Sequence, residues 1–246
     1  MNGTSGTLAT PTVDFVLDGR PVTAFEGESI LSAAGRHGVA IPRLCYLEGQ
    51  RADGNCRACV VEIKGERVLA PSCCRNVTVG MEVQATSARA LKSQQMVLEM
   101  LLSDMPDSGY KWNDGQETPQ ADPPVLGAAD GLARASGDLA QTVGQHGELS
   151  QWAAQMGVVV RPELQALRRE QPCTDVSHPA MAVNLDACIQ CTRCVRACRE
   201  VQVNDVIGYA MRGSHSQIVF DLGDPMGDST CVGCGECVQA CPTGAL

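Results

Sequence analysis

The chain contains few of the large side chains that usually build an apolar core. Aromatic residues make up only 3% of its 246 residues, with two Trp, three Tyr and three Phe. Its 14 cysteines are unusually many by comparison. We therefore expect cysteine-bound metal to organise much of the interior. At roughly 150 residues per domain, the length fits one large domain or two small ones.

Positive charge is also scarce. Lys and Arg number 19 against 28 Asp and Glu, which gives a formal net charge of -9 at pH 7. A protein that binds nucleic acid needs a basic face, and so few cations cannot assemble one. We therefore exclude nucleic acid as a partner.

Long apolar runs are absent. No stretch reaches the roughly 18 apolar residues that a membrane span requires. Residues 1–7 have neither the basic start nor the apolar run of a secretory leader. We expect no membrane span and a cytoplasmic, reducing location, where regularly spaced cysteines predict a metal framework rather than disulfides.

Motifs for substrate chemistry are missing as well. The sequence has no G-x-G-x-x-G fingerprint and no arrangement typical of a Ser-His-Asp or paired-carboxylate site. We therefore predict no catalytic residue and no NAD, flavin or molybdopterin site on this chain. Because each cluster predicted below has four cysteines, surface or packing roles are assigned to His37, His146, His178 and His215.

The C-terminal third contains the pattern C-x2-C-x2-C-x3-C twice. Three closely spaced cysteines bind one [4Fe-4S] cubane, and in paired sites the fourth cysteine binds the neighbouring cluster. We predict a first cubane on Cys188, Cys191, Cys194 and Cys241, and a second on Cys231, Cys234, Cys237 and Cys198. Pro242 fits this ferredoxin pattern, whereas Arg199 stands where a proline is usual.

A pair of zinc ribbons is the alternative for these cysteines. Zinc ligands commonly occur as C-x2-C pairs that are well separated in sequence. Four cysteines within 11 residues, repeated once, are poorly explained by zinc. The spacing therefore favours two cubanes.

The N-terminal third carries a different pattern, C-x10-C-x2-C-x13-C, formed by Cys45, Cys56, Cys59 and Cys73. A long loop around one C-x2-C pair with a distant fourth cysteine is the plan of plant-type [2Fe-2S] ferredoxins, although their spacing differs. We predict one 2Fe-2S cluster on these four cysteines. Cys74 is predicted to be a packed thiol, and Cys173 a structural one.

The segments around this pattern predict a β-grasp domain. Two strands are expected at 13–17 and 20–24, joined by an Asp18-Gly19 turn, with further strands at 60–64 and 81–85. Helices are expected at 28–37, at 87–102 with Ser87 as the cap, at 148–157, and at 162–169 with Pro162 in the first turn.

Together these features predict an α+β chain of three parts. Residues 1–86 form a β-grasp 2Fe-2S domain, 87–175 a helical and loop-rich linker, and 176–246 a bacterial ferredoxin domain with two 4Fe-4S clusters. Four Pro and seven Gly among the 42 residues 106–147 indicate an irregular loop.

With both cysteine patterns, the chain resembles the N-terminal iron-sulfur region of the alpha subunit of cytosolic NAD-dependent formate dehydrogenase. It is more distantly similar to the large peripheral iron-sulfur subunit of complex I and the small diaphorase subunit of NAD-linked hydrogenase. The matching segments are 42–73, 101–104 and 185–245, and residues 199–209 are most similar to the formate dehydrogenase branch.

Two features of the family are missing. The family usually has a histidine after Leu-Leu-Ser-Asp, followed by cysteines that hold a further cubane, but here Met105 and Gly109 occupy the first two of these positions. We expect that cluster to be absent. The molybdopterin domain that follows in the family is absent too, so either a separate subunit carries the catalytic site or the chain is truncated.

The resemblance implies a relay subunit that carries electrons between a flavin- and NAD-binding diaphorase subunit and a catalytic molybdopterin subunit of the formate dehydrogenase type. The alternatives are a subunit of an NAD-linked hydrogenase or other acceptor complex and, less favoured, a redox-sensing protein. Four arginines lie beside predicted ligands: Arg57, Arg193, Arg196 and Arg199. They either raise a cluster's potential, or they are solvated or pair with carboxylates of a partner.

Overall fold

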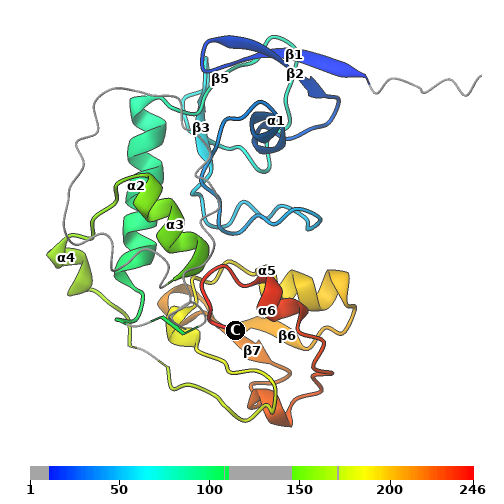
Figure 1. The fold of residues 1–246 in the computed structure, drawn as a ribbon, viewed down its shortest axis with the longest axis vertical. Coiled ribbons are helices and arrows are strands. Elements are labelled where there is room, and N and C mark those ends of the chain that lie inside the picture. Colours follow the sequence, from blue (N-terminus) through cyan, green and yellow to red (C-terminus); the bar gives the residue numbers. More distant parts are fainter. Residues whose placement is uncertain (1–10, 108, 111–145, 171) are drawn as a thin grey trace, which may run out of the picture. The chain divides into compact units, whose positions relative to one another are not determined.

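The computed structural model describes residues 11–107, 109–110, 146–170 and 172–246 (Figure 1). These residues divide into two units, and each is described by itself. The first unit comprises residues up to 41 together with 59–93, and the second comprises 42–58 together with 94–246. Most of the loop predicted at 106–147 lies outside the described residues, and the three-part division of the chain stays a prediction.

The first unit is built on a five-stranded sheet in the order β2-β1-β5-β3-β4. The strands are β1 Thr12–Leu17, β2 Arg20–Phe25, β3 Val60–Ile63, β4 Ala70–Pro71 and β5 Glu82–Gln84. Strands β1 and β2 are antiparallel, while β1 and β5 are parallel. This mixed sheet confirms the predicted β-grasp fold.

The β1–β2 hairpin turns at Asp18 and Gly19, as predicted. Both residues have positive φ, 48° and 78°, which suits the right-handed twist of a two-residue hairpin. Asp18 also accepts a hydrogen bond from the Ala85 amide at 2.8 Å, just after β5. The turn therefore links the hairpin to the closing strand.

Helix α1 (Ile30–Arg36) packs on this sheet and begins two residues later than predicted. Ser29 caps the helix, since its hydroxyl oxygen accepts from the Ser32 amide at 3.2 Å. Glu28, predicted as the first helical residue, instead binds Arg36 at the other end of the helix. Ile30, Leu31, Ala33 and Ala34 form its buried face.

Helix α2 (Ala88–Ser103) begins in the first unit and continues in the second. The Ser87 hydroxyl accepts from the Ala90 amide at 3.1 Å, which confirms the predicted cap. In the second unit, α3 spans Gly147–Gln155 and α4 spans Pro162–Gln165. The first turn of α4 contains Pro162 as predicted, but the helix ends four residues earlier than expected.

The C-terminal part of the second unit consists of short elements that lie together in Figure 1: α5 Arg193–Arg196, α6 Glu236–Ala240, and the antiparallel strands β6 Ile207–Ala210 and β7 Gln217–Phe220. A π-helical turn, Ala197–Val201, follows α5 directly. With Arg199 in place of proline, the backbone amide there remains available and the chain continues in a helical path.

Two apolar cores lie within the second unit. One packs β6, β7 and Met226 around four of the predicted cubane ligands, Cys194, Cys198, Cys237 and Cys241. The other contains Leu98, Met105 and Leu149. Met105, at the position of the family's histidine ligand, is only 5% exposed. Within the described residues, no helix is long and apolar enough to span a membrane.

Candidate iron-sulfur sites

The four predicted ligands of the first cubane line one small cavity. Cys188, Cys191, Cys194 and Cys241 are joined there by apolar residues including Ile189, Ile218 and Leu246. Gln190 and Thr192, between the first three cysteines, have φ of 55° and 63°. This left-handed backbone turns the loop tightly around the cavity, and the Gln190 amide donates to the Cys188 Sγ at 3.4 Å.

A second small cavity collects the other predicted set, with Cys198 from the first motif and Cys231, Cys234 and Cys237 from the second. The Gly233 amide donates to the Cys231 Sγ at 3.4 Å. Gly233 and Gly235 have φ of 67° and 78°, which L side chains rarely adopt. The fourth cysteine of each motif thus lies with the first three of the other.

Both sets fit a cubane chemically. Burial raises the pKa of the Cys188 and Cys237 thiols to about 11 and that of Cys194 well above its ordinary value of 9.0. Such thiols become thiolates when bound iron supplies the compensating positive charge. In the described part of the chain, no three His, Cys, Asp or Glu side chains converge as ligands of a single ion do.

Of the four predicted 2Fe-2S ligands, Cys45 and Cys56 belong to the second unit, and Cys59 and Cys73 belong to the first. In the second unit, the Cys45 amide donates to the Cys56 Sγ at 3.4 Å, and the Cys56 amide to the Cys45 Sγ at 3.5 Å. The neighbouring Cys45 thiol is the main cause of a strongly raised Cys56 pKa, and burial adds to it. In the first unit, the Sγ atoms of Cys59 and Cys73 lie 3.4 Å apart.

Two cysteines differ from their predicted environments. Cys74 and Cys173 are both exposed, so neither is the packed or structural thiol that the sequence analysis expected. The Cys74 Sγ lies 3.6 Å from that of the buried Cys73. The two residues lie in a turn in which the Cys74 amide donates to the Pro71 carbonyl oxygen at 3.0 Å, and only Cys73 is buried there.

The four arginines beside the predicted ligands differ in burial. Arg193 and Arg196 are each 2% exposed, which contradicts a solvated role for them. Arg57 is exposed, and Arg199 pairs with Asp205 of its own chain at 2.5 Å. Sequence reasoning had no means to separate the buried pair from the exposed one.

None of the four histidines lines either of the two small cysteine cavities. His146 is buried, and this burial lowers its pKa below 6.5. His37 lies within 2.7 Å of the Thr23 carbonyl oxygen, and His178 accepts from the Ala180 amide at 3.2 Å. His215 lines the pocket described next. These positions agree with the predicted surface and packing roles.

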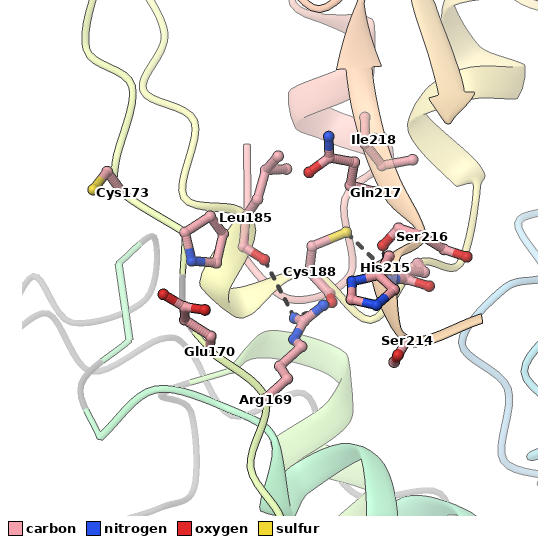
Figure 2. A pocket seen from close by; sticks show the side chains of 12 residues that line it. Arg169, Glu170, Cys173, Leu185, Cys188, Ser214, His215, Ser216, Gln217 and Ile218 are labelled. Carbon is pink, nitrogen blue, oxygen red and sulfur yellow. Dashed lines mark hydrogen bonds between the residues drawn. The ribbon is translucent and has the colours of Figure 1, made fainter. Parts of the chain in front are cut away.

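An open pocket of about 590 Å³ lies beside the first cubane set (Figure 2). Cys188 contributes to its wall together with Arg169, Cys173 and His215. Arg169 donates to the carbonyl oxygen of Cys188 at 2.7 Å and pairs with Asp104 at 2.7 Å, so its charge is already engaged. The pocket makes Cys188 the ligand of this set that solvent reaches most readily.

Comparisons with known proteins follow the two cysteine patterns. Residues 10–88 match a family model described as a 2Fe-2S iron-sulfur cluster binding domain. Residues 178–246 match the ferredoxin-like domain of NADH-quinone oxidoreductase subunit 3. The chain combines these two ferredoxin domains. Its β-grasp unit is therefore a 2Fe-2S domain.

The curated relatives are much longer than this chain. NADP-reducing hydrogenase subunit HndD of Solidesulfovibrio fructosivorans is 34% identical over 239 residues, which cover 94% of this chain and 35% of that protein. NADPH-Fe(3+) oxidoreductase subunit alpha of Geobacter sulfurreducens is 30% identical over 95% of the chain and 24% of its own length. The chain thus spans a quarter to a third of these relatives and is homologous to their iron-sulfur regions.

A solved structure shows the same fold. The chain is similar to one in the crystal structure of an NAD+-reducing [NiFe]-hydrogenase, with a TM-score of 0.70 and 23% identity over 94% of this chain and 85% of that one. These relatives support the hydrogenase alternative better than the formate dehydrogenase interpretation, which none of the reported matches supports.

Proposed function

We propose that the chain is the iron-sulfur electron-transfer part of an NAD(P)-linked oxidoreductase complex. It holds one 2Fe-2S cluster on Cys45, Cys56, Cys59 and Cys73, and two cubanes on the crossed cysteine sets. The observation that carries the proposal is the pair of cavities, each lined by three cysteines of one motif and the fourth of the other. A protein with a single redox group has no need of this arrangement.

Each cluster, when bound, supplies a one-electron redox centre. The protein's own contribution is to hold the ligands, to exclude water and to donate amide hydrogen bonds to sulfur. Such hydrogen bonds stabilise the more negative, reduced state of a cluster and so raise its potential. The amides of Gln190 and Gly233 already donate to ligand sulfurs and act in this way.

The partners follow from the relatives' names. We infer a flavin- and NAD(P)-binding diaphorase subunit on one side and a catalytic hydrogenase module on the other. A molybdopterin subunit of the formate dehydrogenase type is the second candidate, favoured only by the similarity of residues 199–209. A cytoplasmic location is part of this proposal.

Iron content tests the cluster assignment. Anaerobically reconstituted protein should hold about ten iron atoms, two from the 2Fe-2S cluster and four from each cubane. A content of about 14 would reveal a further cubane, and about six would remove one of the two proposed here. Electron paramagnetic resonance (EPR) of the reduced protein separates the 2Fe-2S signal from the cubane signals.

Identification of the partners tests the rest. A gentle anaerobic affinity purification from the native host should recover a flavoprotein together with the catalytic subunit. Nickel, or an iron-only hydrogenase subunit, supports the hydrogenase assignment. Molybdenum or tungsten with a molybdopterin subunit would instead establish the formate dehydrogenase type, and recovery of an isolated chain would contradict the relay proposal.

A further inference from the structure

Arg196 joins two cysteine-bearing loops within the second unit. Its Nη2 donates to the carbonyl oxygen of Cys45 at 2.6 Å and to that of Cys191 at 3.4 Å. Its Nη1 donates to the Arg51 carbonyl oxygen, and its Nε lies 3.3 Å from the Asp53 carboxylate. One buried side chain thus holds backbone atoms of both segments.

Neighbouring contacts connect the same two segments. Arg193 donates to the Leu44 carbonyl oxygen at 3.2 Å and pairs with Glu148 at 2.9 Å. The Thr192 hydroxyl donates to the Asp53 carboxylate at 2.8 Å. The side-chain amide of Asn55 donates to the Gln190 carbonyl oxygen, also at 2.8 Å. Side-chain hydrogen bonds therefore connect residues 44–55 to residues 190–196 at several positions.

The chemistry of arginine suits this task. The guanidinium is planar, permanently charged and carries five donors in a fixed geometry, so one group can bind several carbonyl oxygens at once. A lysine ammonium at the same place cannot reproduce this planar arrangement of donors on three separate nitrogens. The charge is tolerated in the interior because every contact is a carbonyl or carboxylate oxygen.

The two loops carry ligands of different clusters. Cys45 is assigned to the 2Fe-2S cluster and Cys191 to the first cubane. Electron transfer slows steeply as the distance between two centres grows, and contacts behind the ligands fix where ligands lie. A residue that holds both ligand backbones therefore controls the distance between the two clusters.

We propose that Arg196 is a positioning residue that holds the Cys45 loop against the Cys191 loop and so keeps the 2Fe-2S cluster and the first cubane within direct electron-transfer distance. This inference rests on the proposed function.

The test compares Arg196→Gln and Arg196→Lys with the wild-type chain. Arg199→Gln is the matched control. Arg199 lies three residues after Arg196, is exposed and pairs with Asp205. Each protein is reconstituted, its iron is counted, and the fully reduced state is examined by EPR. Magnetic interaction between two reduced clusters reports their separation.

The wild-type chain and Arg199→Gln should show splitting or fast relaxation of the 2Fe-2S signal caused by the nearby cubane. In Arg196→Gln that interaction should be lost while iron remains near ten atoms. Amides of residues 44–53 should exchange hydrogen at least about tenfold faster, as expected when charge-assisted hydrogen bonds are removed. Arg196→Lys should give an intermediate result.

Unchanged magnetic interaction in Arg196→Gln with full iron would overturn the proposal. If that variant does not fold, Arg196→Lys decides alone, because a single ammonium nitrogen cannot replace the separate contacts of Nη2, Nη1 and Nε, and the interaction must still weaken. Failure of the proposed function is distinct from either outcome: the wild-type chain itself would then lack the iron content or the 2Fe-2S signal.

Discussion

Cys73 and Cys74 are adjacent thiols in opposite environments. Cys73 is buried beside Cys59, whereas Cys74 is exposed. A cluster ligand has to lie close to the other ligands, and the Cys73 Sγ is 3.4 Å from the Cys59 Sγ. We therefore expect Cys73, not Cys74, at the distant fourth position of the 2Fe-2S set.

This assignment predicts different iron contents for two neighbouring substitutions. Cys73→Ser should lower iron to about eight atoms and remove the 2Fe-2S signal, because its ligand is gone. Cys74→Ser should retain about ten atoms and the full signal. Metal analysis with EPR measures both. Retention of the signal in Cys73→Ser would mean that Cys74 serves as the ligand. The two single substitutions distinguish these assignments.

At the scale of elements, an ion pair joins the two ends of α1. Glu28 precedes the helix and accepts two hydrogen bonds from Arg36 in its last turn, at 2.9 and 2.6 Å. These bonds to Arg36 are the main reason that the pKa of Glu28 lies below its ordinary value of 4.5. Arg36 also stacks over Phe25, 4.3 Å from the ring centre, and so ties α1 to the end of β2.

Glu28→Gln should lower the free energy of unfolding by about 0.5–1 kcal/mol at pH 7, a modest effect because water screens the partly exposed pair. The folded-state pKa of Glu28 is depressed, so its stabilisation is fully present above pH 4.5 and is lost as pH falls through the folded-state value. The difference between variant and wild type should therefore shrink below pH 4.5 in anaerobic chemical unfolding. Glu82→Gln, which breaks an exposed pair with Lys64, serves as the control.

Helix α2 ends two residues before Met105, the position at which the family resemblance led us to look for a histidine ligand. Met105 packs with Leu98, Leu149 and Ala153, and no cysteine lies between Cys74 and Cys173 in the sequence. An apolar thioether fills this space without needing a hydrogen-bond partner. This segment is therefore part of an apolar core.

Met105→His should accordingly destabilise the protein by about 1–3 kcal/mol, because an imidazole buried in this core lacks polar partners. Iron content should stay near ten atoms, since no thiols follow to complete a cubane. Met100→His is the control, because Met100 lies in the last turns of α2, five residues before Met105, and is 60% exposed. A gain of four iron atoms in Met105→His would refute the loss of this cluster.

At the scale of the whole molecule, the two units differ in how many predicted cluster ligands their apolar cores contain. The first unit has an apolar core of its own, including Leu17, Ile30, Val61 and Val83. The C-terminal core of the second unit is small and contains four cluster cysteines. A core of this kind is completed by the metal, because metal binding supplies much of its folding energy.

Removal of iron with a chelator should therefore unfold the region 176–246 while the β1–β2 hairpin keeps its protection. Hydrogen exchange followed by mass spectrometry measures the two regions separately. Equal loss of protection in both would show that the first unit also depends on its cluster for folding. Equal retention would show that the C-terminal core folds without metal.

The cysteine patterns and the β-grasp strands were predictable because they depend on local spacing. A tight loop can bring three cysteines together only when they are two residues apart, and a two-residue turn at Asp18-Gly19 determines the register of its hairpin. The short strands β4, β6 and β7 were not predicted, since runs of two to four residues carry little periodic pattern.

Burial was decided only by the tertiary structure. Arg193, Arg196 and Arg199 have the same local spacing on one helical segment, yet two are buried and one is exposed. The difference arises because residues 42–58, remote in sequence, pack on the first two. The sequence by itself determined the two cysteine patterns, and with them the clusters that we propose. Long-range packing determined which side chains fix the distances between their ligands, because a side chain's environment depends on segments that no local pattern connects.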